Sequence, residues 1–285
     1  MNLFFDEALA NDYSSGSQKT RVMSEPWAAK ELFCPCCGND RLTKFPNGKP
    51  VADFFCSRCN EIFELKSKKG KFGRKISGGA YDATIKRITS DKNPHLLALE
   101  YRVAGTRFEV CGLTLIPKFF FTPSVVERRS PLPATARRAG WVGSKIWLSE
   151  IPESGRVPVV RDGKALEKTE VVAAYRRCER LQTRNLESRG WLLEVMTCIE
   201  KIPTDVFRLN DVYAFVDELN ENIRRTIILG RKFVSRRNFY AIAVSLNFCS
   251  AAFIASPLDA AVKAGIINDS SVGVRRFAGS VFNER

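Results

Sequence analysis

Two short segments of the chain alternate between side chains of different character with a period of two, which predicts β-strands. The first covers residues 51–55 and has Asp53 at its centre. The second covers residues 62–66, where Glu64 and Lys66 alternate with two apolar residues. A strand places residues i and i+2 on one face, so Glu64 and Lys66 should project together. If the two strands form a hairpin, Asp53 can meet Glu64 across it.

The rest of the first two thirds of the chain predicts a mixed α/β domain. The expected elements are a helix over residues 17–33, a short helix over 80–90 with Tyr81, Ile85 and Ile88 on one side, strands over 95–103 and 108–116, a Pro- and Arg-rich loop over 123–138, and a charged stretch over 161–188 with a helix and then a linker.

A new pattern begins near Gly190. Two amphipathic helical patterns are separated by Pro203; their apolar positions are Trp191, Val195, Cys198 and Ile199, then Leu209, Val212, Phe215, Val216 and Leu219. Two short helices of this kind open many winged-helix domains, although any small helical bundle has the same pattern. We therefore expect two domains, residues 1–183 and 184–285.

The C-terminal tail contains an uncharged run from residue 238 to residue 258. A membrane span needs about 20 predominantly apolar residues. This run includes several Asn and Ser residues, and Pro257 would end a helix. We therefore favour a buried helix over a membrane span. Residues 258–268 and 273–277 could form a last helix and wing.

Four cysteines have the spacing of a zinc ribbon. Cys34 and Cys37 form one CxxC knuckle, and Cys56 and Cys59 form another after eighteen intervening residues. This spacing is typical of closed sites with four thiolate ligands. Cys36 could replace Cys37, but the usual gap of two residues favours Cys37. The first thirty residues lack the continuous apolar core of a secretory signal, so we expect a reducing, cytoplasmic setting and structural Zn²⁺ rather than disulfides.

Asp53, Glu64 and Lys66 together suggest metal-dependent phosphodiester cleavage. Two carboxylates, with the Leu65 carbonyl as a further oxygen ligand, suit Mg²⁺. Such an ion polarises a phosphate and lowers the pKa of a bound water, and a lysine ammonium can orient that water or stabilise the transition state. Many exposed strands carry Glu-x-Lys by chance. Here apolar neighbours, the adjoining cysteine site and a following basic run favour the nuclease interpretation.

The overall charge favours a polyanionic partner. The net charge is +14 and the positive residues recur in several clusters, which indicates nucleic acid first and an anionic membrane only distantly. The clusters lie at residues 66–75, 128–129, 137–138, 164–189 and 224–237. The single histidine, His95, excludes nucleases that use paired histidines or a histidine base, and we expect it to begin a strand without a catalytic role.

Five runs of the sequence resemble the DpnI-like family of methyl-directed (Type IIM) restriction endonucleases, which cut GATC when its adenine carries an N6-methyl group. The runs are SQK at 17–19, CP at 34–35, PVADF at 50–54, FELKSKKG at 63–70 and TARRAGW at 135–141. The resemblance covers about residues 1–220. It implies a PD-(D/E)XK nuclease core with an inserted zinc ribbon, followed by a winged helix, both of which read the methylated site. It also implies catalytic roles for Asp53, Glu64 and Lys66, and zinc binding by Cys34, Cys37, Cys56 and Cys59.

The same resemblance matches Trp141 to a methyl-sensing tryptophan. A methylated adenine shows extra apolar surface in the major groove, and an indole offers a flat apolar face to it. Arg137 and Arg138 suit phosphates or guanine edges. A buried core tryptophan is the simpler alternative for Trp141.

Two functional classes follow from these observations. The first is a monomeric, magnesium-dependent endonuclease acting on double-stranded DNA with N6-methyladenine in GATC. The second is a non-catalytic zinc-ribbon and winged-helix protein that reads methylated DNA. The presence of Asp53, Glu64 and Lys66 favours the enzyme.

Overall fold

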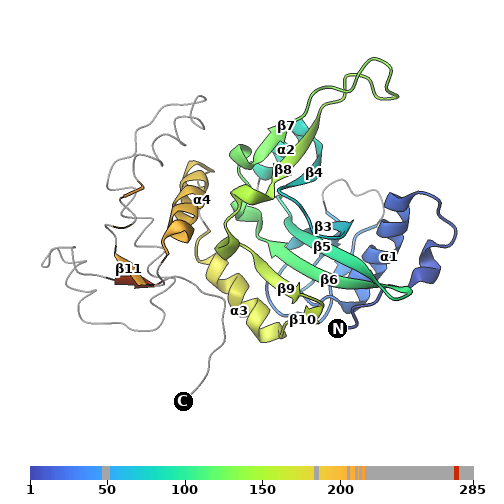
Figure 1. Ribbon diagram of the computed structural model, residues 1–285, viewed down its shortest axis with the longest axis horizontal. Helices are drawn as coiled ribbons and strands as arrows, with labels where there is room; N and C mark the ends of the chain where they lie inside the picture. Colours follow the sequence, from blue (N-terminus) through green and yellow to red (C-terminus); the bar gives the residue numbers. More distant parts are fainter. Residues whose placement is uncertain are drawn as a thin grey trace, which may run out of the picture. The chain divides into compact units, whose positions relative to one another are not determined.

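The computed structural model describes residues 1–46, 52–90, 92–182, 186–203, 206–208, 211, 214–215 and 273–275. The chain divides into two compact units, Met1–Gln182 and Thr183–Arg285. Figure 1 shows the secondary structure of the two units.

The first unit is built on a mixed sheet in the order β1-β2-β3-β5-β6-β9-β10. Its strands are β1 (Thr43–Lys44), β2 (Phe54–Phe55), β3 (Ile62–Lys69), β5 (His95–Ala104), β6 (Arg107–Ile116), β9 (Val157–Arg161) and β10 (Lys164–Ala165). The central pair β3 and β5 is parallel, and the other pairs are antiparallel. The strands expected over 95–103 and 108–116 are confirmed as β5 and β6. β5 buries Leu96, Leu97 and Leu99, and β6 buries two leucines and two β-branched residues, as expected for inner strands.

A second, three-stranded antiparallel sheet has the order β4-β8-β7. Its strands are β4 (Lys75–Ala80), β7 (Val126–Arg128) and β8 (Gly143–Trp147), and helix α2 (Tyr81–Ile88) follows β4 directly. The expectation of a continuous loop over 123–138 is therefore wrong at its start. Pro123 opens a short 3-10 helix, because proline fixes φ and suits a first turn, and β7 follows it. The remaining loop, residues 129–142, joins β7 to β8 and extends outward in Figure 1.

Two longer helices cover the large sheet. These are α1 (Gly16–Glu31) and α3 (Lys168–Glu179), and the short 3-10 helices are η1 (Glu7–Ala10), η2 (Lys118–Phe120), η3 (Pro123–Val125), η4 (Leu148–Glu150) and η5 (Glu153–Gly155). Helix α1 buries Met23 and Trp27, four residues apart and hence on one face. In α3, Tyr175 is buried with its ring centroid 5.6 Å from that of His95 on β5. The helices expected over 17–33 and 80–90 are thus confirmed as α1 and α2.

The second unit contains helix α4 (Leu186–Lys201) and an antiparallel pair of strands, β11 (Val206–Arg208) and β12 (Gly273–Arg275). The helical pattern near Gly190 is confirmed, but the helix already begins at Leu186, inside the segment expected to be a linker. The helix expected around Leu209 to Leu219 falls mostly outside the described residues, as do the uncharged run 238–258 and the segment 258–268. Across the described part of the chain, no helix combines the length and apolar character that a bilayer crossing requires.

Candidate functional site

Asp53 lies beside Glu64 where strands β2 and β3 of the large sheet begin to pair. It precedes β2 rather than lying inside a strand, which corrects the strand expected over 51–55, and Val51 is outside the described residues. The register pairs Phe54 with Phe63, so the next pair outward is Asp53 and Glu64. The Asp53 N–H donates to the Phe63 carbonyl at 2.9 Å, and the Leu65 N–H donates to Asp53 Oδ2 at 2.7 Å. One of these hydrogen bonds fixes the Asp53 main chain against β3, and the other fixes its carboxylate.

Glu64 is held by two cations. Its Oε1 lies 2.7 Å from Lys66 Nζ, and its Oε2 lies 2.9 Å from Arg87 Nη2. Lys66 follows two residues later on the same face of β3, as the alternation predicts, while Phe63 and Leu65 are buried on the other face. Arg87 comes from α2 and had no place in the sequence prediction. In the sequence, Arg87 is marked only by its place on a short amphipathic helix, one turn after Thr84, which is buried.

These residues line a pocket of about 440 Å³. The other lining residues come mainly from one face of α1, and the full set is Ser17, Thr20, Arg21, Ser24, Glu25, Ala52, Asp53, Glu64, Leu65, Lys66, Ser67 and Arg87. A larger hollow of about 640 Å³ between the N-terminal segment and α1 contains none of the predicted site residues. The pocket at Asp53 is therefore the place where the predicted chemistry gathers.

The electrostatics of the pocket favour a cation beside Asp53. Burial raises the pKa of Asp53, and the negative charges of Glu25 and Glu64 raise it further, against the opposing Leu65 hydrogen bond. Glu25, on α1, is itself buried and paired with Arg21 and Lys44. Sequence reasoning missed Glu25, although a carboxylate between the buried positions Met23 and Trp27 is unusual for a helix facing a core.

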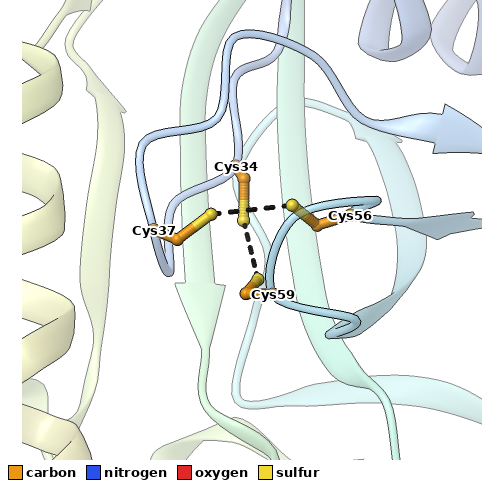
Figure 2. A group of neighbouring side chains, drawn as sticks. All are labelled: Cys34, Cys37, Cys56 and Cys59. Carbon is orange, nitrogen blue, oxygen red and sulfur yellow. Dashed lines mark hydrogen bonds between the residues drawn. The ribbon is translucent and has the colours of Figure 1, made fainter.

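The four predicted zinc-binding cysteines come together (Figure 2). Their sulfur atoms all lie within 4.8 Å of one another, with Cys34 3.7 Å from Cys59 and Cys37 3.6 Å from Cys56. A tetrahedral ion with Zn–S bonds of about 2.3 Å gives sulfur separations of about 3.8 Å, whereas a disulfide bond is about 2.05 Å long. Burial raises the pKa values of Cys37 and Cys59, whereas hydrogen bonds, those from the Cys59 and Arg58 backbone first, outweigh burial and lower the pKa of Cys56. The donor set and its geometry thus fit a zinc ion, and Cys36 is not a member of the group.

The second knuckle is tied to the sheet by a buried polar network. The Cys56 N–H donates to the Glu61 carbonyl at 2.9 Å, and the Glu61 carboxylate lies 3.1 Å from His95 Nε2 and 2.6 Å from Lys118 Nζ. His95 Nδ1 accepts a hydrogen bond from the Lys118 N–H at 3.1 Å, so the neutral ring carries its proton on Nε2. Burial disfavours the ionised form of Glu61 and so raises its pKa. The hydrogen bonds and charges of His95 and Lys118 outweigh this effect and lower the pKa of Glu61 to about 2. His95, at the start of β5 as expected, therefore lies away from the pocket and supports the cysteine site.

Trp141 and the two arginines lie on the loop between β7 and β8. Arg137 and Arg138 are exposed, and the Arg138 guanidinium lies 4.6 Å from the centre of the Trp141 ring. Trp141 is only partly buried, so it is not a core residue of the first unit. A Cβ at Gly143 would come within 2.6 Å of the Trp141 ring, so this glycine makes room for the indole. The structure does not bring this group into the pocket with Asp53.

A comparison with protein families adds to this geometry. The family model DpnI, described as the Dam-replacing family, matches residues 1–184. The chain belongs to the Dam-replacing family. A second family model, DpnI_C, the Dam-replacing HTH domain, matches residues 187–229. Membership in the Dam-replacing family implies a methylation-dependent restriction endonuclease with a C-terminal helix–turn–helix, and hence DNA as the partner.

Proposed function

We propose that the protein is a magnesium-dependent endonuclease that hydrolyses double-stranded DNA at GATC sites carrying N6-methyladenine. The observation that carries this proposal is the meeting of Asp53, Glu64 and Lys66 in one pocket, within a chain of the Dam-replacing family. In this proposal residues 1–183 form a PD-(D/E)XK nuclease domain with an inserted zinc ribbon. Residues 184–285 form a winged-helix-like second DNA reader, and the enzyme acts as a monomer.

Asp53 and Glu64 would hold Mg²⁺ together with the Leu65 carbonyl. The donor set fits, because oxygen ligands are those that magnesium prefers and because the buried Asp53 carboxylate has a raised pKa that a cation would relieve. When bound, the ion polarises the scissile phosphate and acidifies a water molecule. The backbone hydrogen bond from Leu65 keeps Asp53 oriented before any ligand arrives.

Lys66 would donate to the attacking water or to a phosphate oxygen. Its ammonium group is bound to Glu64 yet its side chain is 34% exposed, so it can reach a substrate in the pocket. A positioned cation is worth most where negative charge develops in the transition state. Glu64 thus orients Lys66 as well as serving as a ligand.

The four-cysteine cluster would hold structural Zn²⁺. All four ligands are protein thiolates, which leaves no open coordination position for catalysis. Cys56 and Cys59 lie between Asp53 and Glu64 in the sequence, so the metal would close the β2–β3 hairpin that carries both carboxylates. Methyl recognition would fall to Trp141, with Arg137 and Arg138 contacting phosphates or guanine edges.

The proposal is tested with purified protein, magnesium and plasmid DNA from adenine-methylating and non-methylating hosts. The wild-type protein should cut only the methylated plasmid. Lys66→Ala should lower the cleavage rate by about 10²–10³-fold, as for loss of one transition-state donor. Lys69→Ala is the matched control, because Lys69 is exposed on the same strand and outside the pocket. Cleavage of both plasmids at equal rates would refute the methyl specificity, and an unimpaired Lys66→Ala would refute the site.

A further inference from the structure

Arg87 is placed to act inside the pocket. It lies in the last turn of α2, and its Nη2 contacts Glu64 Oε2 at 2.9 Å, with 21% of its side chain exposed. The helix is anchored by a hydrogen bond of 3.1 Å between the hydroxyls of Thr84 and Ser144, and Ser144 also donates to the Gly79 carbonyl. The guanidinium is therefore carried on a fixed support and not on a mobile loop.

The hydrogen bonding of Arg87 is incomplete. Among the described residues, two buried side-chain polar atoms have no hydrogen-bond partner, Arg87 Nε and Ser67 Oγ, and both residues line this pocket. Such atoms are rare in folded proteins and call for an explanation. Arg156 shows how a structural arginine behaves in the same unit, because it donates to the carbonyls of Leu148 and Ile151 from Nε and Nη2. Arg87 instead retains a donor for an acceptor that the protein does not supply.

The chemistry of the missing acceptor follows from the donor. A guanidinium is a rigid planar fork that matches the oxygens of a phosphate with two parallel N–H bonds. The Glu64 carboxylate takes one Arg87 donor at Nη2, and the Nε–H is left without an acceptor. Lys66 and Arg21 line the same pocket beside the carboxylates Glu25, Asp53 and Glu64, and the DNA backbone of the proposed function would bring phosphate oxygens there.

We propose that Arg87 is a phosphate-binding residue of the nuclease site, donating through Nε to a non-bridging oxygen of the DNA backbone in the pocket. This proposal rests on the proposed function. In the free protein, Arg87 and Lys66 both pair with the Glu64 carboxylate. If Glu64 holds the metal of the proposed function, part of its charge would be taken up by that ion, and a backbone phosphate would be a strong acceptor for the Arg87 guanidinium.

The test measures binding and does not depend on cleavage. Full-length wild-type protein, Arg87→Ala, Arg87→Lys and the control Arg102→Ala are titrated with a methylated GATC duplex in calcium instead of magnesium, over a range of salt. Arg102 is an arginine of the same unit that pairs with Glu109 and lies outside the pocket. Loss of one phosphate contact should reduce the slope of log K against log salt by about 0.9 in Arg87→Ala, and Arg102→Ala should keep the wild-type slope.

A second arm locates the contact. Neutral methylphosphonates replace the backbone phosphates of the duplex one at a time. One replacement should weaken the wild-type protein about tenfold, at the scale of a single phosphate contact, and should leave Arg87→Ala unchanged. Arg87→Lys keeps a charge but loses the fork, so it should show an intermediate loss at the same phosphate. If Arg87→Ala does not fold, the Arg87→Lys variant alone tests the phosphate contact.

The outcomes separate this proposal from the proposed function. A wild-type salt slope and methylphosphonate profile in both Arg87 variants would overturn the phosphate contact, even if methylated plasmid is cut and Lys66→Ala is inactive. A protein that binds methylated duplex through Arg87 but never cuts DNA would support the contact and refute the nuclease. Absence of binding by the wild-type protein would overturn both.

Discussion

Replacement of Cys37 by alanine should weaken zinc binding and lower the stability of the first unit. Structural zinc in small zinc-finger peptides contributes about 10–16 kcal/mol, and one of four ligands thus accounts for about 3 kcal/mol. Folded domains are stable by only about 5–15 kcal/mol in total. Cys37 is the suitable position because it is only half-buried, so its truncation removes a ligand without opening a large cavity.

Cys36 is the matched control for this experiment. It is adjacent in sequence and 2% exposed, but its sulfur is outside the four-sulfur group. Cys36→Ala should cost about 1 kcal/mol through lost burial and should keep zinc. For a unit of this size, about 1 kcal/mol corresponds to about 2–4 °C in Tm, so we expect losses of about 6–12 °C for Cys37→Ala and about 2–4 °C for Cys36→Ala.

The assay combines metal analysis of the purified protein with thermal unfolding followed by circular dichroism. We expect one zinc per wild-type chain and per Cys36→Ala chain, and substantially less in Cys37→Ala. A Cys36→Ala variant that loses zinc while Cys37→Ala retains it would show that the ligand set is misassigned. Zinc-free wild-type protein with full stability would refute the reasoning altogether.

Two further predictions concern the pocket and the loop. Asp53→Asn should abolish cleavage yet stabilise the magnesium-free protein at pH 7 by about 0.5–2 kcal/mol. Burial raises the pKa of Asp53, so its ionised form destabilises the folded protein. This destabilisation is absent below the ordinary pKa of aspartate and grows as the pH rises above it. Urea unfolding should therefore show the gain from Asp53→Asn at pH 7 and not at pH 4, and a loss of stability at pH 7 would contradict this. Trp141→Ala should weaken binding of methylated GATC duplex much more than binding of unmethylated duplex. The control is Trp147→Ala, which removes an indole of β8 that packs against Lys75 of β4, and it should leave the ratio of the two affinities unchanged. Equal losses on both duplexes for Trp141→Ala would contradict the role of Trp141.

Local patterns were sufficient for the parts of the site that lie close in sequence. The CxxC spacing predicted which four sulfurs meet, because two residues between ligands fix a knuckle regardless of the rest of the fold. The period-two alternation placed Glu64 and Lys66 on one face of β3, and the hairpin brought Asp53 next to Glu64. The strand expected around Asp53 was too long, since pairing with β3 begins only at Phe54.

The contributions from helices could not be predicted in the same way. Glu25 and Arg87 reach the pocket from α1 and α2, and no motif links either residue to Glu64. Their positions depend on how each helix packs, which is a property of the tertiary structure. The same holds for the contact between Glu61 and His95, two residues 34 positions apart whose pairing follows from the parallel alignment of β3 and β5.

Helix α2 explains how the loop and the pocket keep a fixed separation. At its start, the Tyr81 N–H donates to the carbonyl of Val142, the residue after Trp141, at 3.0 Å. Near its end, Arg87 contacts Glu64. Eight residues of helix span about 12 Å at 1.5 Å per residue, and the Thr84 hydroxyl anchors the middle of the helix to β8. If the loop reads the methylated base and the pocket cuts, as proposed, the two sites need a constant distance between them. Because α2 contacts Val142 at its start, Ser144 in its middle and Glu64 near its end, a single helical segment connects the base of the loop to the pocket.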